Sequence, residues 1–291
     1  MEKLVYIILI NYNSKIHTVE CVKSLNNIFY KNYKILIIDN NSEDNDFSEI
    51  EDLNNKVLVI KNKSNFGFAA ANNIGIEIAL KNNAEYILLL NNDTVVTPNF
   101  LNILIDEYEN DNNIGICTSK ILYYDFRDTI WYGGGSINKI KGNICIDDLN
   151  KKDFENKKSR ECEFASGCCM LLSSEVINKV GLMSEKYFLY YEDVDYSSKF
   201  LKASYKIKYC PKSVIYHKES VSTKKFSYLY QYYFVRNRLI FIKENLDFIY
   251  KLTAYPITIL WVIKKIICKN FNIRPCALGI KDFLINRYGK K

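Results

Sequence analysis

The sequence has few of the residues that build zinc sites and disulfide frameworks. Its 291 residues include only two His, His17 and His217, and no Cys-x-x-Cys pair. Structural zinc needs four Cys or His ligands at close spacing, so a zinc site is excluded. The nine Cys are an odd number, and Cys168 and Cys169 are adjacent. We therefore expect buried free thiols.

Two nucleotide-binding fingerprints are missing as well. No Gly-x-Gly-x-x-Gly follows the first apolar run, and Gly-x4-Gly-Lys-Ser/Thr occurs nowhere in the chain. These absences exclude the usual dinucleotide oxidoreductases and P-loop NTPases. Gly133-Gly134-Gly135 follows no clear strand, and we predict a flexible loop there. A bound nucleotide has to be held in another way.

Long apolar runs are also absent. Leu4–Ile10 is short and has no basic flank or cleavage site, so we expect no signal peptide and a cytosolic protein. The longest uncharged stretch of the C-terminal part, Leu252–Ile263, falls well short of the ~20 apolar residues of a membrane-spanning helix. The composition, 48% hydrophobic and 25% charged, is that of a globular protein.

The charge of the chain is uneven. Lys224 to Lys291 hold 14 Lys or Arg against 3 Asp or Glu, a net of +11, which leaves −4 for residues 1–223. This basic part is rich in Tyr, Phe and Trp, residues that favour an anionic membrane surface, and we predict a helical extension on the inner face of the plasma membrane. A basic helical tail packed on the core is the alternative. No nucleic-acid module accompanies the charge, so no nucleic-acid partner is expected, and an oligomer stays open.

Short runs of Ile, Val and Leu alternate with helical patterns in the N-terminal half. We predict helices after a Ser14 cap, from about Ala69 to Lys81, and from a Thr97 cap with Pro98 at the first position. Runs that are apolar throughout are typical of parallel strands covered on both faces, so we predict a doubly wound α/β sheet. The predicted strands are Leu4–Ile10, Ile35–Ile38, Val57–Ile60, Tyr86–Leu90 and Ile114–Cys117.

The pattern loosens after Lys120. We predict irregular loop over Trp131–Gly135 and Lys139–Arg160. The elements predicted beyond these loops are a strand at Cys168–Leu172, a helix at Ser174–Val180 closed by Gly181, a helix from the Tyr187–Asp195 run to about Lys202, and a strand near Lys206–Cys210.

Short polar groups follow four of these segments. In open α/β sheets ligands bind at the carboxyl ends of the strands. One such group alone is ordinary turn chemistry, but four at one edge predict a nucleotide site. The groups are Asn11-Tyr12-Asn13, Asp39-Asn40-Asn41-Ser42, Asn65-Phe66-Gly67-Phe68-Ala69 and Asn91-Asn92-Asp93-Thr94.

Two acidic positions add chemistry to this edge. Asp93 ends the most hydrophobic strand with Asn91 two residues before it, and such oxygen ligands suit Mg²⁺ or Mn²⁺ on phosphate oxygens. Glu192-Asp193-Val194-Asp195 follows an aromatic run, where a carboxylate can take a proton from an attacking hydroxyl. The same residues also suit the first turn of an ordinary helix, because the helix dipole favours acidic groups there.

Together these motifs resemble the family-2 inverting glycosyltransferases of the GT-A fold, particularly the rhamnosyltransferase-like branch that builds bacterial polysaccharides. The motifs span about residues 5–240 in the right order and as a set are highly specific. They are Ile10-Asn11-Tyr12-Asn13, Ile38-Asp39-Asn40-Asn41-Ser42, Asn65-Phe66-Gly67-Phe68-Ala69 through Asn72-Asn73-Ile74-Gly75, Leu90-Asn91-Asn92-Asp93-Thr94, Gly167 through Leu171, Phe188 through Asp195, His217, and Arg236-Asn237.

The resemblance implies a role for each matched residue. Asp39 contacts the nucleobase. The metal motif falls on Asn91-Asn92-Asp93, with Asn at its first position, so that Asp93 and His217 bind Mg²⁺ or Mn²⁺. A packed His is the alternative for His217. The residues implied in the rest of the nucleotide pocket are Asn11, Tyr12, Asn13, Asn41, Asn65, Gly67, Asn91 and Asn92.

The resemblance also implies the catalytic groups. Asp193 is the base, Glu192 orients the acceptor, and Arg236 with Asn237 meets the diphosphate or a lipid-phosphate acceptor. The implied reaction is a single displacement with inversion. It moves a sugar from dTDP-rhamnose or a UDP-sugar to a hydroxyl of a growing glycan, which the basic tail suggests is linked to polyprenyl diphosphate.

The expected organisation is a GT-A catalytic domain over 1–223 and a basic aromatic helical extension over 224–291. The nucleotide-sugar half ends at about 120, and the acceptor half covers about 121–223. Two alternatives stay open: a nucleotidyltransferase, against which stands the lack of a Gly/Arg/Lys-rich loop after the first strand, and a catalytically idle membrane-surface scaffold.

Overall fold

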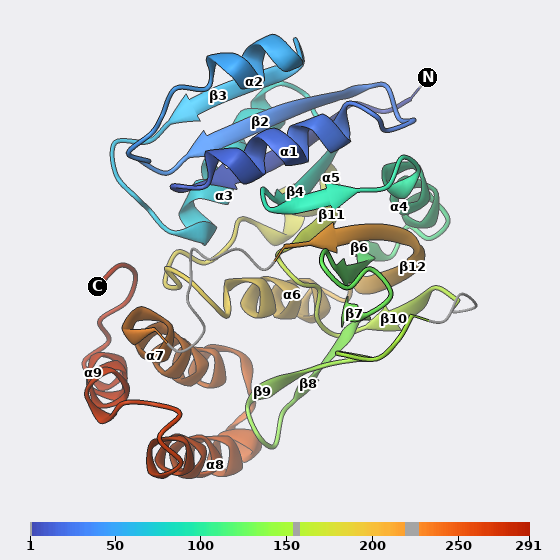
Figure 1. Cartoon of the computed structure of the whole chain (residues 1–291). Coiled ribbons are helices and arrows are strands. Elements are labelled where there is room, and N and C mark those ends of the chain that lie inside the picture. The colour runs from blue at the N-terminus through green and yellow to red at the C-terminus, as the bar shows by residue number, and fades with distance from the viewer. Residues whose placement is uncertain (1, 154–157, 219–226) are drawn as a thin grey trace.

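The computed structural model describes residues 2–153, 158–218 and 227–291, and in these ranges a mixed ten-stranded sheet forms the centre of the molecule. Helices cover this sheet, and three helices at the C-terminal end lie beside it (Figure 1). The strands follow the order β10-β12-β6-β11-β4-β1-β2-β3, with β5 on β12 and β7 on β6, and β8 and β9 form a separate hairpin. This is the α/β architecture that the sequence predicts.

The strands are β1 (Val5–Asn11), β2 (Tyr33–Asp39), β3 (Val57–Lys61), β4 (Tyr86–Asn91), β5 (Thr94–Val96), β6 (Ile114–Tyr123), β7 (Ile130–Tyr132), β8 (Gly135–Asn138), β9 (Asn143–Ile146), β10 (Arg160–Cys162), β11 (Cys169–Ser173) and β12 (Lys206–His217). The helices are α1 (Lys15–Leu25), α2 (Ser48–Leu53), α3 (Phe68–Lys81), α4 (Phe100–Glu109), α5 (Ser174–Val180), α6 (Glu192–Lys202), α7 (Tyr228–Asn245), α8 (Phe248–Ile267) and α9 (Ile273–Leu284).

β1, β2 and β4 are buried on both faces, which explains their unbroken apolar runs. Successive side chains of a strand point to opposite faces. In β1, Ile7 packs with the cluster that contains Val22 of α1, whereas Ile8 packs with Ile76 of α3. The parallel register places Asn11 beside Asp39 and Ile10 beside Asn91, so the polar residues after three strands share one edge of the sheet.

The predicted start of the third helix is wrong by two residues. α4 begins at Phe100 with Asn99 as its N-cap. The Thr97 hydroxyl instead donates to Val214 O at 2.8 Å and thereby ties the end of β5 to β12.

The predicted irregular loops at Trp131–Gly135 and Lys139–Arg160 are also wrong, because they contain β9 and parts of β7, β8 and β10. Strands of three or four residues show no periodic pattern in a sequence. Their support comes from distant residues: Arg238 of α7 donates to Gly142 O at 3.1 Å and to Lys141 O at 2.6 Å. Gly135 opens β8, and a Cβ there would lie 2.7 Å from the Phe164 ring, so the glycine run is packed.

The last strand runs further than predicted. β12 continues to His217 through an irregularity between Cys210 and Val214. Pro211 lies in this stretch, where a residue without an N–H interrupts regular pairing, and the alternating pattern is lost locally. The continuation places His217 opposite Thr94, one residue after Asp93.

The C-terminal part is helical, as predicted, and its predicted boundary between residues 223 and 224 lies outside the described residues. α7 packs on the core through Phe241, whose ring lies 5.7 Å from that of Tyr191. Within the described ranges, no helix is both long enough and apolar enough to cross a membrane.

Candidate active site

The first part of the candidate site is a hydrogen-bonded network at the carboxyl ends of β1 and β2. The Asp39 carboxylate is fully buried and accepts from Asn11 Nδ2 at 2.8 Å, from Ser42 Oγ at 2.5 Å and from Ser42 N at 3.1 Å. The Ser42 hydroxyl also accepts from Asn13 N at 2.9 Å. The carboxylate therefore fixes the two loops that follow β1 and β2.

The network extends to the loop after β4. Asn92 Nδ2 donates to Thr18 Oγ1 at 2.8 Å, and Thr18 Oγ1 in turn donates to Asn11 Oδ1 at 2.8 Å. Asn11, Asp39 and Asn92 are thus brought together as predicted. Thr18 and Ser42 complete the network, although the sequence analysis assigned them no role. Ser42 belongs to a quoted motif, but nothing distinguishes Thr18 from the other polar residues of α1.

The exposed residues of this edge belong to the same loops. Tyr12 is 44% exposed, and Asn41 is exposed as well. Asn13 and Asn41 have φ of +49° and +68°, a left-handed conformation that Asn adopts more readily than most residues. These loops present side chains to a ligand, while Asp39 is covered behind them.

The loop after β3 joins this edge to the second half of the chain. Asn40 Nδ2 donates to Gly67 O at 3.1 Å, and Gly67 N donates to Asn65 Oδ1 at 2.9 Å. Gly67 has φ +86°, and a Cβ at this position would lie 2.4 Å from Phe188 O. Only glycine permits this close approach of Phe188, which precedes the predicted catalytic acids.

The second part of the site is the pair formed by Asp93 and His217. Pairing of β5 with β12 brings His217 Nε2 to 3.2 Å from Asp93 Oδ1. Both residues are buried, and the Trp131 ring packs edge-on to the imidazole with centroids 4.5 Å apart. His217 Nδ1 is buried and has no hydrogen-bond partner in the described part of the chain.

This pair fits one small divalent cation. Neighbouring ligands of an octahedral cation lie about 3 Å apart, which is close to the separation of Asp93 Oδ1 and His217 Nε2. Within the described ranges no three His, Cys, Asp or Glu form a cluster, so a cation here would need further ligands from a bound molecule.

The third part of the site is Asp193 at the start of α6. Its Oδ2 accepts from Gly167 N at 3.0 Å, and its Oδ1 accepts from Val194 N at 2.9 Å. Cys168, the next residue after Gly167, accepts through its carbonyl from Asn91 N at 3.0 Å. One short segment before β11 therefore contacts both Asp193 and the end of β4.

The Cys168 thiol shows that the two acidic positions converge. It is buried, and burial raises its pKa well above the usual value, with the negative charges of Asp93 and Asp193 adding to the effect. Asp93 and Asp193 therefore both lie near this buried thiol, although 100 positions separate them in the chain.

Burial shapes the acid–base properties of the Glu192-Asp193 pair. Burial raises the pKa of Asp193, and the N–H donors of Gly167 and Val194 oppose this effect. The pKa of Glu192 lies well above its usual value because the side chain is buried and because Asp193 is negatively charged. Glu192 Oε2 is buried without a hydrogen-bond partner among the described residues, so its hydrogen-bonding capacity is unused there.

A strained turn presents these two acids. Tyr190 and Tyr191 have φ of +71° and +73°, a conformation that is unfavourable for bulky side chains. Asn237 of α7 holds the turn, because its Nδ2 donates to Leu189 O at 2.8 Å and to Tyr190 O at 2.9 Å. From the family resemblance, Asn237 was instead predicted to contact the diphosphate or a lipid-phosphate acceptor.

Arg236 is the one predicted site residue that the structure does not bring to this edge. Its guanidinium is fully buried and donates to Asn237 Oδ1 at 3.0 Å, to Tyr232 OH at 3.1 Å and to Gly289 O at 2.8 Å. It stacks near the rings of Tyr232 and Tyr233. These contacts orient Asn237 and hold the C-terminal segment.

Comparison with known proteins agrees with this geometry. The Glycosyl transferase family 2 model matches residues 6–181. The chain is 26% identical over 192 residues to Glycosyltransferase GlyG of Streptococcus pneumoniae, a match that covers 65% of this chain and 60% of that protein. It is 24% identical over 299 residues to the low-salt glycan biosynthesis hexosyltransferase Agl10 of Haloferax volcanii, covering 98% and 92%.

A rhamnosyltransferase and a solved structure are also similar. The dTDP-rhamnosyl transferase RfbF of Shigella flexneri is 23% identical over 256 residues, covering 84% of this chain and 82% of that protein. The crystal structure of GalNAc-T7 with UDP, GalNAc and Mn2+ has a TM-score of 0.62 at 16% identity, covering 75% of this chain and 44% of that one, which is a likeness of fold. The chain belongs to glycosyl transferase family 2, has the GT-A fold and is a glycosyltransferase.

Proposed function

We propose that this enzyme transfers a sugar, with inversion, from a nucleoside-diphosphate donor to a hydroxyl of a growing cell-surface glycan. The observation that carries the proposal is that one segment, Gly167-Cys168, hydrogen-bonds both to Asp193 and to Asn91, which lies two residues before Asp93. dTDP-rhamnose or a UDP-sugar is the proposed donor, and similarity to a dTDP-rhamnosyl transferase supports the former.

In this proposal, the nucleoside of the donor contacts the loops after β1, β2 and β3. The exposed Tyr12 and Asn41 meet it directly, and Asn65 and Gly67 form the adjoining wall. Asp39 is wholly covered, so we assign it the task of holding Asn11 and Ser42 in place. A direct contact of Asp39 with the base would require these loops to open.

Asp93 and His217 are the proposed ligands of a divalent cation, with Asn91 and Asn92 beside them. A bound cation would offset the negative charge that develops on the departing diphosphate. Mg²⁺ prefers oxygen ligands, so the imidazole of His217 favours Mn²⁺. Mn²⁺ is the cation in the structural relative, in agreement with this choice.

Asp193 is the proposed base. Backbone N–H groups hold its two oxygens from one side, which leaves lone pairs for the proton of an acceptor hydroxyl. The freed oxygen attacks the anomeric carbon from the face opposite the nucleotide, so the configuration inverts. Glu192 accepts or donates a hydrogen bond to the acceptor through its buried Oε2 and orients it.

A donor screen tests the proposal. The enzyme is incubated with Mn²⁺, dTDP-rhamnose and a panel of UDP-sugars, together with nucleoside triphosphates, and the products are identified by mass spectrometry. Release of a nucleoside diphosphate, with an inverted anomeric signal in the product by NMR, is the expected result. Release of pyrophosphate from a triphosphate alone would instead indicate a nucleotidyltransferase.

The acceptor and the place of action complete the proposal. We propose that the acceptor is a polyprenyl-diphosphate-linked glycan and that the enzyme works on the inner face of the plasma membrane. The net positive charge and the aromatic side chains of the C-terminal part support this location.

A further inference from the structure

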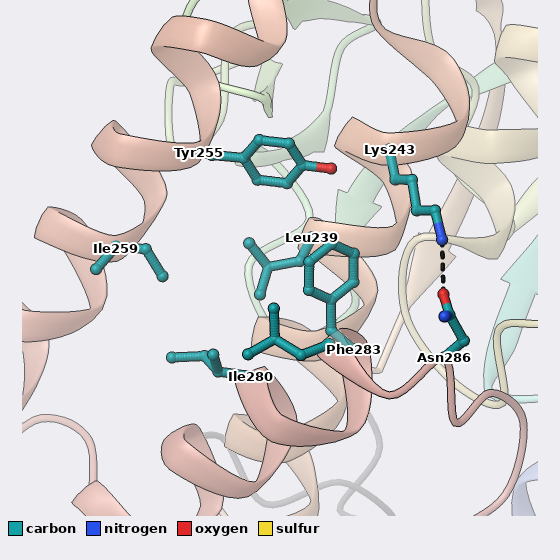
Figure 2. Close-up of a pocket in the computed structure, with 8 residues that line it drawn as sticks. Leu239, Lys243, Tyr255, Ile259, Ile280, Phe283 and Asn286 are labelled. Atoms are coloured by element: carbon teal, nitrogen blue, oxygen red, sulfur yellow. Dashed lines mark hydrogen bonds between the residues drawn. The ribbon is translucent and has the colours of Figure 1, made fainter.

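A cavity of about 540 Å³ lies between the three C-terminal helices (Figure 2). Its volume falls within the ~300–1,000 Å³ of ordinary small-molecule pockets. Apolar side chains from all three helices form its wall, and Lys243 and Asn286 form its polar end, where their side chains meet (Figure 2). The apolar lining is Leu239, Tyr255, Ile259, Ile280, Phe283 and Leu284.

The cavity faces away from the proposed catalytic turn, which is the strained turn at Tyr190 and Tyr191. Asn237 points from α7 to the backbone of Leu189 and Tyr190. At about 100° per residue, Leu239 and Lys243 lie roughly 200° and 240° around the same helix, on its other side. A molecule in the cavity therefore does not reach Asp193 through α7 and is not the reacting group.

The polar end of the cavity carries a positive charge beside neutral partners. Lys243 is exposed, and its Nζ donates to Asn286 Oδ1 at 2.6 Å and to Tyr288 OH at 3.1 Å. The nearby Glu244 carboxylate pairs with Lys186 instead, at 3.0 Å. An amine in this setting fits an anionic head group.

An exposed apolar stripe on α8 adjoins the cavity. Leu252 and Ile263 are 60% and 47% exposed, and they lie three and four residues from the lining residues Tyr255 and Ile259, on the same helix face. Exposed apolar patches of this kind mark protein or membrane contacts. The other large apolar residues exposed on α8 are Phe248, Ile249, Leu260 and Ile267.

We propose that this cavity binds one acyl chain of an anionic phospholipid, with the phosphate at Lys243 and α8 lying in the head-group layer. The inference rests on the proposed membrane location and gives it a defined lipid site. Residues 227–291 hold 12 Lys or Arg against 3 Asp or Glu, so a second copy of this basic surface would be repelled while an anionic lipid is attracted.

The test uses the full chain without donor or metal, so that failure of the transferase proposal leaves its result intact. Vesicles of phosphatidylglycerol and phosphatidylcholine that contain a phosphatidylglycerol with a photoreactive acyl chain are irradiated with the protein. Mass spectrometry then maps the cross-links. We expect cross-links at Ile259, Ile280 or Phe283, and cross-links confined to other surfaces would overturn the proposal.

Variants give a second readout. Lys243→Gln should weaken flotation with anionic vesicles about fivefold, the factor that corresponds to ~1 kcal/mol per Lys near such a surface. Phe248→Ser should weaken it further. Phe126→Ser, which changes an equally apolar residue that is 66% exposed on the catalytic domain, is the matched control. Unchanged flotation of both C-terminal variants would overturn the proposal, as would a dimer that only these variants dissociate.

Discussion

Two regions of this enzyme are built in opposite ways. The first is the proposed donor edge, formed by the loops after β1, β2 and β4, and the second is the proposed catalytic turn, formed by Tyr190 and Tyr191 before Asp193. At the donor edge, parallel strands end in register, and Asn11, Asp39 and Asn92 become neighbours through the sheet itself. The catalytic turn instead depends on residues far apart in the chain, since Asn237 holds the left-handed aromatic turn and Gly167 N donates to Asp193 directly after it. The first region thus depends on sheet register, whereas the second depends on strain and burial that distant elements maintain.

The largest expected effect separates the two regions at the base. Asp193→Asn should lower kcat by about 10²–10⁴, the usual contribution of a general base, while nucleotide binding stays unchanged. Steady-state transfer and calorimetry with the nucleoside diphosphate check this. Asp106→Asn, at an exposed position on α4, controls for the loss of one charge. Activity of Asp193→Asn within about tenfold of wild type would reject the assignment.

The next effect belongs to the donor edge. Asp93→Asn and His217→Gln should each weaken Mn²⁺-dependent nucleotide binding by at least the roughly 10–100-fold that changes around a bound metal cost. Calorimetry with and without a chelator measures this. If nucleotide binding is equally tight after chelation in the wild type, the pair is an ordinary ion pair and not a cation site.

The support of the catalytic turn gives a smaller effect. Asn237→Ala removes two hydrogen bonds to backbone carbonyls and should lower kcat about 30-fold, because each bond contributes on the order of 1 kcal/mol. The KM for the donor should stay constant, which separates this role from a phosphate contact. A rise in donor KM with unchanged kcat would return Asn237 to the phosphate site.

The smallest expected effect is on the pH profile. A base must be deprotonated to act, and burial raises the pKa of Asp193 while the pKa of Glu192 lies higher still. The acidic limb of kcat/KM should therefore fall at a pH above the ~3.9 of an ordinary Asp, and the apparent value belongs to the pair. Because Glu192 stays protonated where Asp193 loses its proton, Glu192→Gln should leave the limb in place, and a shift of the limb to lower pH would contradict this order of the two pKa values.

The donor edge was predictable and much of the catalytic turn was not. Apolar runs locate β1, β2 and β4, and parallel ends must share an edge, so Asn11, Asp39 and Asp93 follow from local pattern. No local pattern in the sequence predicts the contact between Gly167 and Asp193. The left-handed Tyr190 and its partner Asn237 were equally hidden, because aromatic residues rarely adopt this conformation and the stabilising bonds cross 47 positions.

The part of the chain after β6 shows the same limit of prediction from local pattern. β7 to β10 are strands of three or four residues held by long-range contacts such as those of Arg238. The local sequence therefore predicts a loop there. The family resemblance implied a phosphate contact for Arg236, but its partners at Tyr232 and Gly289 are neutral and internal. Composition predicts the charge of this part and not the direction of each side chain.

Anomalous diffraction from a crystal grown with Mn²⁺ and a nucleoside diphosphate tests most directly whether the three acidic positions serve one site. We expect one manganese peak within ligand distance of Asp93 and His217, the nucleoside against Tyr12 and Asn41, and the diphosphate on the side that faces Asp193. A manganese peak and nucleotide bound away from Asp93, or with the diphosphate directed away from Asp193, would contradict the account.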